Sequence, residues 1–119
     1  MYEKSKIVDS FHIAGFQYHD GALALGKLKA GKKLTLVPEF DNPYDPNAIA
    51  IYRKGVHLGY VPKACNALLA QLLFFGHGDA FECRVMQVDK KANPWEQVRV
   101  GIYVTDARKK NPDEENATF

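Results

Sequence analysis

The sequence predicts a mainly β protein with two short helices, in which about six short strands curl into a small barrel. Its 119 residues suffice for one domain with one hydrophobic core. Hydrophobic residues make up 46% of the chain and charged residues 25%, the usual balance of a folded globular domain. Antiparallel strands this short leave exposed edges unless the sheet closes or is covered, which favours a barrel. The segments that read as strands are residues 6–14, 33–37, 48–52, 57–60, 80–88 and 98–104.

Each strand is recognised by alternation and by the residues that end it. Phe11 and Ile13 alternate with polar or small neighbours, as in a half-buried strand. The second strand ends at Pro38, which lacks the N–H group that strand pairing needs. The last four strands form two hairpins, the first with a turn at residues 53–55 and the second with a long connection at residues 89–96.

Two segments predict short helices. Asp20 is placed to cap the first, which Gly31 closes, and its apolar residues are Leu23, Leu25 and Leu28. Pro62 suits the first turn of the second helix, and Gly76 suits the left-handed position after its end. The apolar stripe of this second helix consists of Cys65, Leu68, Leu69, Leu72 and Leu73.

The chain shows no pattern typical of a membrane protein. Its richest apolar stretch, residues 67–75, is far shorter than the ~18 residues that a membrane span needs. We expect a cytoplasmic protein, nucleoid-associated if it is bacterial, with no membrane partner. Residues 1–105 are expected to form one domain, and residues 106–119 a flexible C-terminal tail without apolar periodicity.

The sequence gives no indication of catalysis or of a metal. Cys65 and Cys83 are too few for a zinc site or a disulfide framework, and the four histidines lack metal-binding spacing. No Ser-His-Asp or Cys-His arrangement is visible. We therefore expect no enzymatic activity, no cofactor and no small-molecule substrate.

The charge of the chain is compatible with more than one kind of partner. The formal net charge is +2, which helps phosphate binding without requiring it. A lysine-rich segment at residues 27–33 either assists phosphate binding or is an ordinary solvated helix end. Composition alone does not separate these interpretations.

The most informative segment is the loop at residues 39–47. Asn42 and Asp45 each precede a proline and are restricted to extended conformations, while Pro43 and Pro46 have fixed φ. Tyr44 is therefore displayed beside a carboxylate in a pre-organised loop, which lowers the entropy lost on binding.

Three interpretations of this loop compete. It could be a rigid connector with Tyr44 folded onto the barrel. It could hold a metal through Asp41, Asp45 and Asn47, although the spacing matches a calcium loop poorly and a nuclease built on Asp41 and Asp45 is a remote alternative. It could also bind a ligand, with Tyr44 stacking on a base and Asp45 accepting a hydrogen bond.

Three blocks of the sequence resemble the HIRAN domain in order and spacing. They are IAGFQYH at residues 13–19, DNPYDPNAI at residues 41–49 and LGYVPK at residues 58–63. The resemblance covers roughly residues 7–104 and implies a modified OB-like or SH3-like small β-barrel. It also implies a module of DNA repair or replication that captures the 3′-hydroxyl end of single-stranded DNA. In that family the module is often fused to DNA-remodelling helicases, so a helicase or another repair protein is an expected partner.

The resemblance assigns a role to particular residues. Tyr44 would stack on the terminal base, Asp45 would accept the hydrogen bond of the 3′-hydroxyl group, and Asn42 would support that pocket. Tyr18 would add a second aromatic surface, and Lys63 would meet a phosphate.

Three further positions belong to the expected DNA-binding set. Trp95 lies in the long hairpin connection, where a family member places a stacking aromatic residue. Gln17 stands in place of an arginine that contacts DNA, and Tyr60 in place of a histidine, so both changes weaken backbone contacts. The alternative function, from another class, is a protein- or peptide-interaction module that uses the same aromatic groove.

Overall fold

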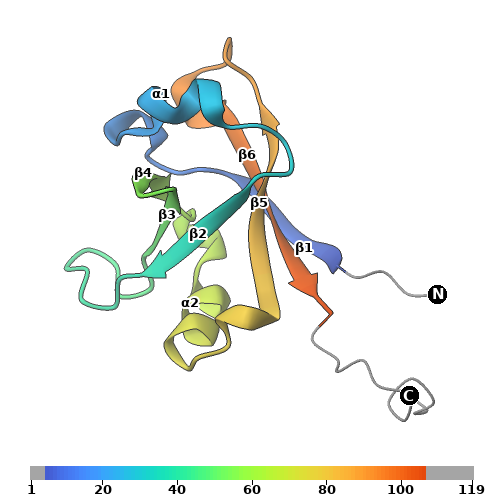
Figure 1. Cartoon of the computed structure of the whole chain (residues 1–119). Helices are drawn as coiled ribbons and strands as arrows, with labels where there is room; N and C mark the ends of the chain where they lie inside the picture. Colours follow the sequence, from blue (N-terminus) through green and yellow to red (C-terminus); the bar gives the residue numbers. More distant parts are fainter. Residues whose placement is uncertain (1–4, 107–119) are drawn as a thin grey trace, which may run out of the picture.

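Six antiparallel strands form one sheet in the computed structural model, which describes residues 5–106 (Figure 1). The order of the strands across the sheet is β1-β6-β5-β2-β3-β4. The predicted mainly β fold with six strands is therefore confirmed. The strands are β1 (Ser5–His12), β2 (Lys33–Pro38), β3 (Ile49–Arg53), β4 (Val56–Tyr60), β5 (Phe81–Val88) and β6 (Val98–Thr105).

The sheet curls as in the barrel-like fold that the sequence predicts, but it does not close. Strands β1 and β4 are its two edges, and an isolated bridge joins them beyond the end of β1. There the Ala14 N–H group donates to the Tyr60 carbonyl at 2.8 Å, and the Tyr60 N–H group donates to the Ala14 carbonyl at 2.9 Å. The predicted first strand runs to residue 14, but β1 ends at His12 because the chain then leaves β6 for β4.

A glycine makes this close crossing possible. Gly59 has a φ of 153°, and a Cβ atom at this position would lie 2.4 Å from the Ala14 carbonyl oxygen. Any side chain here would therefore push the first block of the sequence away from β4. The Leu-Gly-Tyr sequence at residues 58–60 thus has a structural role at the edge where the candidate site lies.

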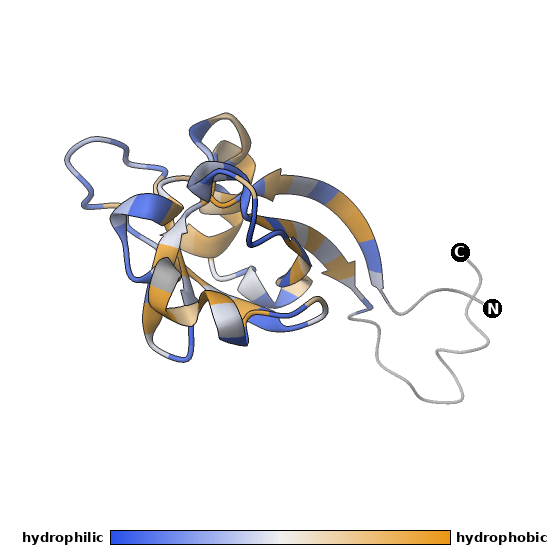
Figure 2. Ribbon diagram, turned by 90° about the horizontal axis from the view of Figure 1, so that it is seen from above, coloured by the Kyte–Doolittle hydropathy of each residue, from blue (hydrophilic) through white to orange (hydrophobic). Residues whose placement is uncertain are grey.

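The core lies inside the curl of the sheet and continues under the segments that follow β1 and β4. Along the strands the ribbon alternates between hydrophobic and hydrophilic residues, as the sequence pattern predicts (Figure 2). The largest fully buried side chains are Phe16, Ile13, Ile49, Ile51, Leu58, Ile102, Val85, Val98, Val100 and Cys83.

The first predicted helix is shorter than expected. The α-helix α1 (Gly21–Ala24) has four residues and passes into a 3-10 turn, η2 (Leu25–Lys27). The Asp20 side chain makes no capping hydrogen bond, so the expected cap is wrong, and Leu23 is 84% exposed. Leu28 is buried because the chain after η2 turns back onto the sheet, where the Gly31 N–H group donates to the Val85 carbonyl.

The second predicted helix is α2 (Ala67–Phe74), at the other end of the sheet from α1 (Figure 1). Pro62 does not begin this helix but precedes a 3-10 turn, η3 (Lys63–Cys65). Gly76 has a φ of 86°, as predicted for the position after the helix. Leu69 is buried, whereas Leu68 is 72% exposed, because a helix of eight residues turns only one face to the sheet.

Two further expectations concern membrane association and the C-terminal tail. In residues 5–106 no helix is both long and apolar enough to pass through a membrane. The predicted C-terminal tail lies outside the described residues from position 107 onward.

Candidate functional site

A pocket of ≈ 360 Å³ opens between the loop at residues 39–47, the end of β4 and the turn η3. It combines two aromatic rings, one carboxylate and one lysine with a small apolar floor. Its lining residues are Ala14, Asn42, Tyr44, Asp45, Ala48, Tyr60, Val61, Lys63 and Asn66.

Asn42 folds the loop that forms one wall of the pocket. Its side-chain oxygen accepts hydrogen bonds from the N–H groups of Tyr44 at 2.8 Å and Asp45 at 3.1 Å. Its side-chain amide donates to a carboxylate oxygen of Glu39 at 3.1 Å. The turn expected from the Asn-Pro and Asp-Pro pairs is thus fixed by hydrogen bonds of Asn42 as well as by proline.

The Tyr44 ring projects from this fixed turn into solvent. Its side chain is 90% exposed although it lines the pocket, so it does not pack onto the sheet. The interpretation of the loop as a connector with a buried tyrosine is therefore wrong. An exposed ring on a fixed backbone offers a flat face for stacking with little loss of entropy.

The carboxylate of Asp45 is oriented by donors on two sides. One oxygen accepts a hydrogen bond from the Asn47 N–H group at 2.9 Å, and the other accepts one from the Asn66 side-chain amide at 2.8 Å. These two donors, with a smaller contribution from Lys63, lower the pKa of Asp45 below its ordinary value. Because an ionised carboxylate has about four acceptor positions, it retains acceptor capacity toward the pocket.

Tyr60 also lines the pocket, and its hydroxyl group is a fixed donor. Its hydroxyl group donates to the Glu39 carboxylate at 2.9 Å, the same oxygen that accepts from Asn42. Partial burial, together with the Glu39 carboxylate, raises the pKa of Tyr60 to about 12. The ring also contacts His19 and His57 edge-on, with ring centroids 5.5 and 5.1 Å away.

The structure brings together five of the eight residues predicted to bind DNA. Asn42, Tyr44, Asp45, Tyr60 and Lys63 all line the pocket. The other three lie on the neighbouring surface: Gln17 and Tyr18 in η1 (Phe16–Tyr18), and Trp95 in η5 (Pro94–Glu96).

The neighbouring surface connects directly to the pocket. The turn η1 packs against both β4 and η5, so it lies between the pocket and the hairpin connection. Tyr18 is 79% exposed and Trp95 is 52% exposed. Two further rings are thus available beside the pocket, on the side away from α2.

Sequence reasoning missed two residues that organise the site, Glu39 and Asn66. Asn66 is buried and its side-chain amide reaches Asp45, which lies 21 positions earlier in the chain. Its place just before an apolar helix suggests a cap, but its side chain forms no capping hydrogen bond. Only the fold reveals this contact, because the local sequence around Asn66 carries no information about the loop.

The described residues offer little basis for metal or thiol chemistry. Within residues 5–106, no group of three or more His, Cys, Asp and Glu side chains is placed to bind a metal ion. Burial raises the pKa of Cys83 to about 12 and also raises that of Cys65, so both thiols stay protonated at neutral pH.

Two solved structures share this fold. A protein from Lactobacillus plantarum aligns with a TM-score of 0.67 and 24% identity, over 84% of this chain and 94% of its own. The HIRAN domain of human HLTF aligns with a TM-score of 0.57 and 18% identity, over 87% of this chain and 82% of its own. At these identities the likeness shows the fold alone.

The sequence itself identifies the family. No curated protein matches it. The model of the HIRAN domain, a nucleic-acid-binding module with an OB-like fold and no catalytic role, matches residues 9–105. Because this match spans far more than half of its 119 residues, the chain belongs to the HIRAN domain family.

Proposed function

We propose that this protein binds single-stranded DNA and captures its 3′-hydroxyl end in the pocket beside the loop at residues 39–47. The observation that carries the proposal is the shared placement of the exposed Tyr44 ring and the Asp45 carboxylate in one open pocket. Tyr44 stacks on the terminal base, which any base allows because every base has a π-face. Asp45 accepts a hydrogen bond from the terminal hydroxyl group.

Asp45 gives the pocket its preference for a free end. An ionised carboxylate accepts hydrogen bonds but has none to donate, so it pairs with a hydroxyl group. A 3′-phosphate or a continuing strand brings negative charge against it, and such a repulsion is a strong means of discrimination. The hydrogen bonds from Asn47 and Asn66 support this role because they keep the carboxylate ionised and oriented.

The remaining residues of the set have supporting roles in the proposal. Lys63 meets a phosphate near the terminal nucleotide, while Tyr18 and Trp95 stack on preceding bases. Tyr60 donates to Glu39 and serves as a wall of the pocket, and Gln17 brings no charge to η1. Because few phosphates are contacted, the affinity for a short oligonucleotide depends only weakly on salt. In a plot of log affinity against log salt concentration, each contacted phosphate adds about 0.7 to the slope.

Fluorescence anisotropy with short oligonucleotides that differ only at the 3′ end tests the proposal. A 3′-hydroxyl end is expected to bind more tightly than a 3′-deoxy end, because the deoxy end cannot donate to Asp45. A 3′-phosphate end is expected to bind most weakly, because its charge opposes the carboxylate. Equal affinity for all three ends would remove the end-recognition claim.

This activity suits a role in DNA repair or replication, where free 3′ ends arise. A helicase or another repair protein is the partner that such a module would serve, and the cytoplasm or nucleoid is where it would meet DNA. Pull-down of such a protein in the presence of a 3′-hydroxyl oligonucleotide, and its loss with Tyr44→Ala, would support this assignment.

One observation favours the alternative of a peptide-binding module. Phe40, Leu68 and Phe75, at the α2 side of the loop, are each at least 68% exposed. An apolar peptide would use this surface, whereas a DNA end has no need of it. If no oligonucleotide binds at low salt while a peptide partner does, the alternative replaces the DNA-binding proposal.

A further inference from the structure

A second concave surface lies at the end of the sheet that carries α1. A groove of ≈ 680 Å³ runs between the segment at residues 26–30 and the end of β5 with the connection that follows it, residues 86–91. We call it the lysine groove. It is lined by three lysines, one aspartate and several apolar side chains.

The charges of the lysine groove are unbalanced. Three lysines and one aspartate line it, giving +3 − 1 = +2, whereas Lys63 and Asp45 in the pocket cancel. In the part of the chain that the structure describes, Lys29, Lys90 and Lys91 form no ion pair. The carboxylate of Asp89 accepts a hydrogen bond from the Lys91 N–H group at 3.0 Å and so is occupied within its own turn.

Both walls of the lysine groove are fixed by backbone hydrogen bonds. The Gly31 N–H group donates to the Val85 carbonyl at 2.8 Å, and the Val85 N–H group donates to the Lys32 carbonyl at 2.9 Å. On the other wall, the Asp89 N–H group donates to the Gln97 carbonyl at 2.8 Å and closes the hairpin connection. The three lysines are therefore carried on a frame that keeps them together.

The floor of the lysine groove is apolar. Leu28 is buried, and Met86 and Val88 are half-buried, beneath the exposed lysines. A rim of cations over an apolar floor matches a chain that carries phosphates on one side and apolar sugar and base surfaces on the other. Electrostatic attraction between lysines and phosphates is the sequence-independent part of nucleic-acid binding.

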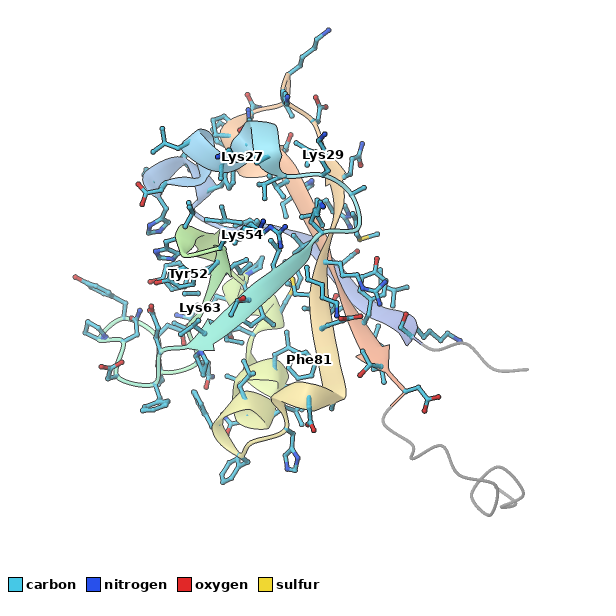
Figure 3. The ribbon with its side chains drawn as sticks, in the orientation of Figure 1. Lys27, Lys29, Tyr52, Lys54, Lys63 and Phe81 are labelled. Carbon is cyan, nitrogen blue, oxygen red and sulfur yellow. The ribbon has the colours of Figure 1, made fainter. Side chains whose placement is uncertain are left out.

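The lysine groove and the pocket are linked by elements that pack against one another. The connection that carries Lys90 and Lys91 also carries Trp95 in η5, and η5 packs against η1, which packs against β4. In Figure 3 Lys27 and Lys29 lie at the α1 end, Lys63 lies near the loop, and Lys54 lies between them in that view. The elements that carry Tyr18 and Trp95 thus link the pocket to the hairpin connection that carries Lys90 and Lys91.

We propose that the lysine groove binds the phosphodiester backbone of the DNA strand whose 3′ end occupies the pocket, at nucleotides on its 5′ side. The direction of the strand rests on the proposed function, whereas the phosphate contacts rest on the three unpaired lysines. The protein thereby recognises the 3′ end in the pocket and binds a longer stretch of the same single strand through the lysine groove. A terminal nucleotide alone would leave the lysine groove empty.

Anisotropy with two oligothymidylates tests this proposal, one of about three nucleotides and one of about 12, which is within the usual site size of an OB-like fold. The longer one is expected to bind more tightly and to show a steeper salt dependence. Three additional phosphate contacts increase the log–log salt slope by about 2, at roughly 0.7 for each phosphate. The triple variant Lys29→Gln, Lys90→Gln and Lys91→Gln is expected to abolish both differences.

The shorter oligonucleotide and a remote lysine provide the controls. Binding of the short oligonucleotide is expected to be unchanged in the triple variant, which also shows that the variant is folded. Lys6→Gln, at an exposed site on β1, is expected to leave the binding of both oligonucleotides unchanged. If the triple variant keeps the length and salt dependence of the natural chain, the lysine groove proposal is overturned.

The proposed function fails in a different way. Equal affinity for a 3′-hydroxyl and a 3′-phosphate end on the short oligonucleotide would remove end recognition and leave the length dependence untouched. Absence of binding by either oligothymidylate to the natural chain would overturn both proposals.

Discussion

The pocket and the lysine groove differ in how firmly their polar groups are held. In the pocket, both oxygens of Asp45 accept hydrogen bonds, and Asn42, Tyr60 and Glu39 form a connected network. In the lysine groove, the ammonium groups of Lys29, Lys90 and Lys91 make no hydrogen bond or ion pair within the described residues. One site has a fixed arrangement of polar groups, and the other has unpaired charges on a hydrogen-bonded backbone.

This difference indicates a division of tasks. Fixed donors and acceptors distinguish one chemical group from another, because a wrong group leaves them unpaired or opposed. Flexible lysines attract any phosphate and add affinity without selectivity. Changes in the pocket should therefore alter which end is bound, whereas changes in the lysine groove should alter only how tightly and at what salt concentration.

The largest expected effect comes from Tyr44→Ala. Loss of one stacked base contact costs about 1–3 kcal/mol, or roughly a fivefold to 150-fold loss of affinity for a 3′-hydroxyl oligonucleotide. The fold should be unaffected because the side chain is 90% exposed. Anisotropy titrations measure the affinity, and thermal unfolding checks the fold.

Phe75→Ala is the matched control for this variant. Phe75 is 75% exposed and does not line the pocket, so its loss should leave affinity unchanged. Equal losses in the two variants would mean that exposed aromatic residues contribute without regard to the pocket.

A smaller effect is expected from Asn66→Leu, which removes one of the two donors that orient Asp45. The pKa of Asp45 should rise toward its ordinary value, because the ionised form loses a hydrogen bond. The preference for a 3′-hydroxyl end should weaken by several-fold. NMR titration of the Asp45 carboxyl group and anisotropy measure the two effects.

Gln71→Leu is the control for this substitution. Gln71 lies in α2, which begins directly after Asn66, and donates to the same loop, but to Asn47, at 3.3 Å. It should leave the pKa of Asp45 unchanged. An unchanged pKa of Asp45 in Asn66→Leu as well would contradict the role assigned to Asn66.

Acidification gives a further, gradual test of the pocket. Hydrogen bonds from Asn47 and Asn66 lower the pKa of Asp45. Its ionised form therefore stabilises the folded loop at pH values above 3.8, which is the ordinary pKa of this carboxyl group. That contribution is lost as the pH falls through the lowered pKa. An NMR titration should give a midpoint below 3.8, and binding of 3′-hydroxyl oligothymidylate should decline only there. A midpoint at or above 3.8 would contradict this account.

The smallest expected effect is that of Tyr60→Phe. It removes the hydrogen bond from the tyrosine hydroxyl group to Glu39, and such a bond contributes about 0.5–1.5 kcal/mol to stability. End preference should be retained because the ring still forms the wall of the pocket. Urea unfolding measures the loss of stability. Tyr52→Phe is the control, because the Tyr52 ring stacks on His57 and its hydroxyl group makes no hydrogen bond within the described residues. This control should lower the free energy of unfolding by less than Tyr60→Phe does.

The sequence predicted those features that depend on local chemistry. Alternation located all six strands to within about two residues, and prolines with Asn and Asp located the fixed loop that displays Tyr44. Gly76 was predicted from the steric freedom that the end of a helix requires. These properties are set by neighbours in the chain, so a single sequence suffices to find them.

Features that depend on distant contacts were not predictable in the same way. The isolated bridge between Ala14 and Tyr60 depends on where the two edges of the open sheet approach each other. The contact of Asn66 with Asp45 spans 21 positions. Lys29 lines the same groove as Lys90 and Lys91 only because β2 pairs with β5. The exposure of Leu68 follows from which face of α2 meets the sheet, and its local pattern does not specify that face.

The central claim is that the Asp45 carboxylate selects a free 3′-hydroxyl end, and Asp45→Asn tests it most directly. This substitution removes the charge and keeps the size and an acceptor oxygen for the Asn47 N–H group. The measurement is the ratio of affinities for 3′-hydroxyl and 3′-phosphate forms of one short oligonucleotide, in the natural chain and in the variant. We expect a clear preference for the hydroxyl end in the natural chain and a ratio near one in Asp45→Asn. An unchanged ratio in the variant would contradict the claim.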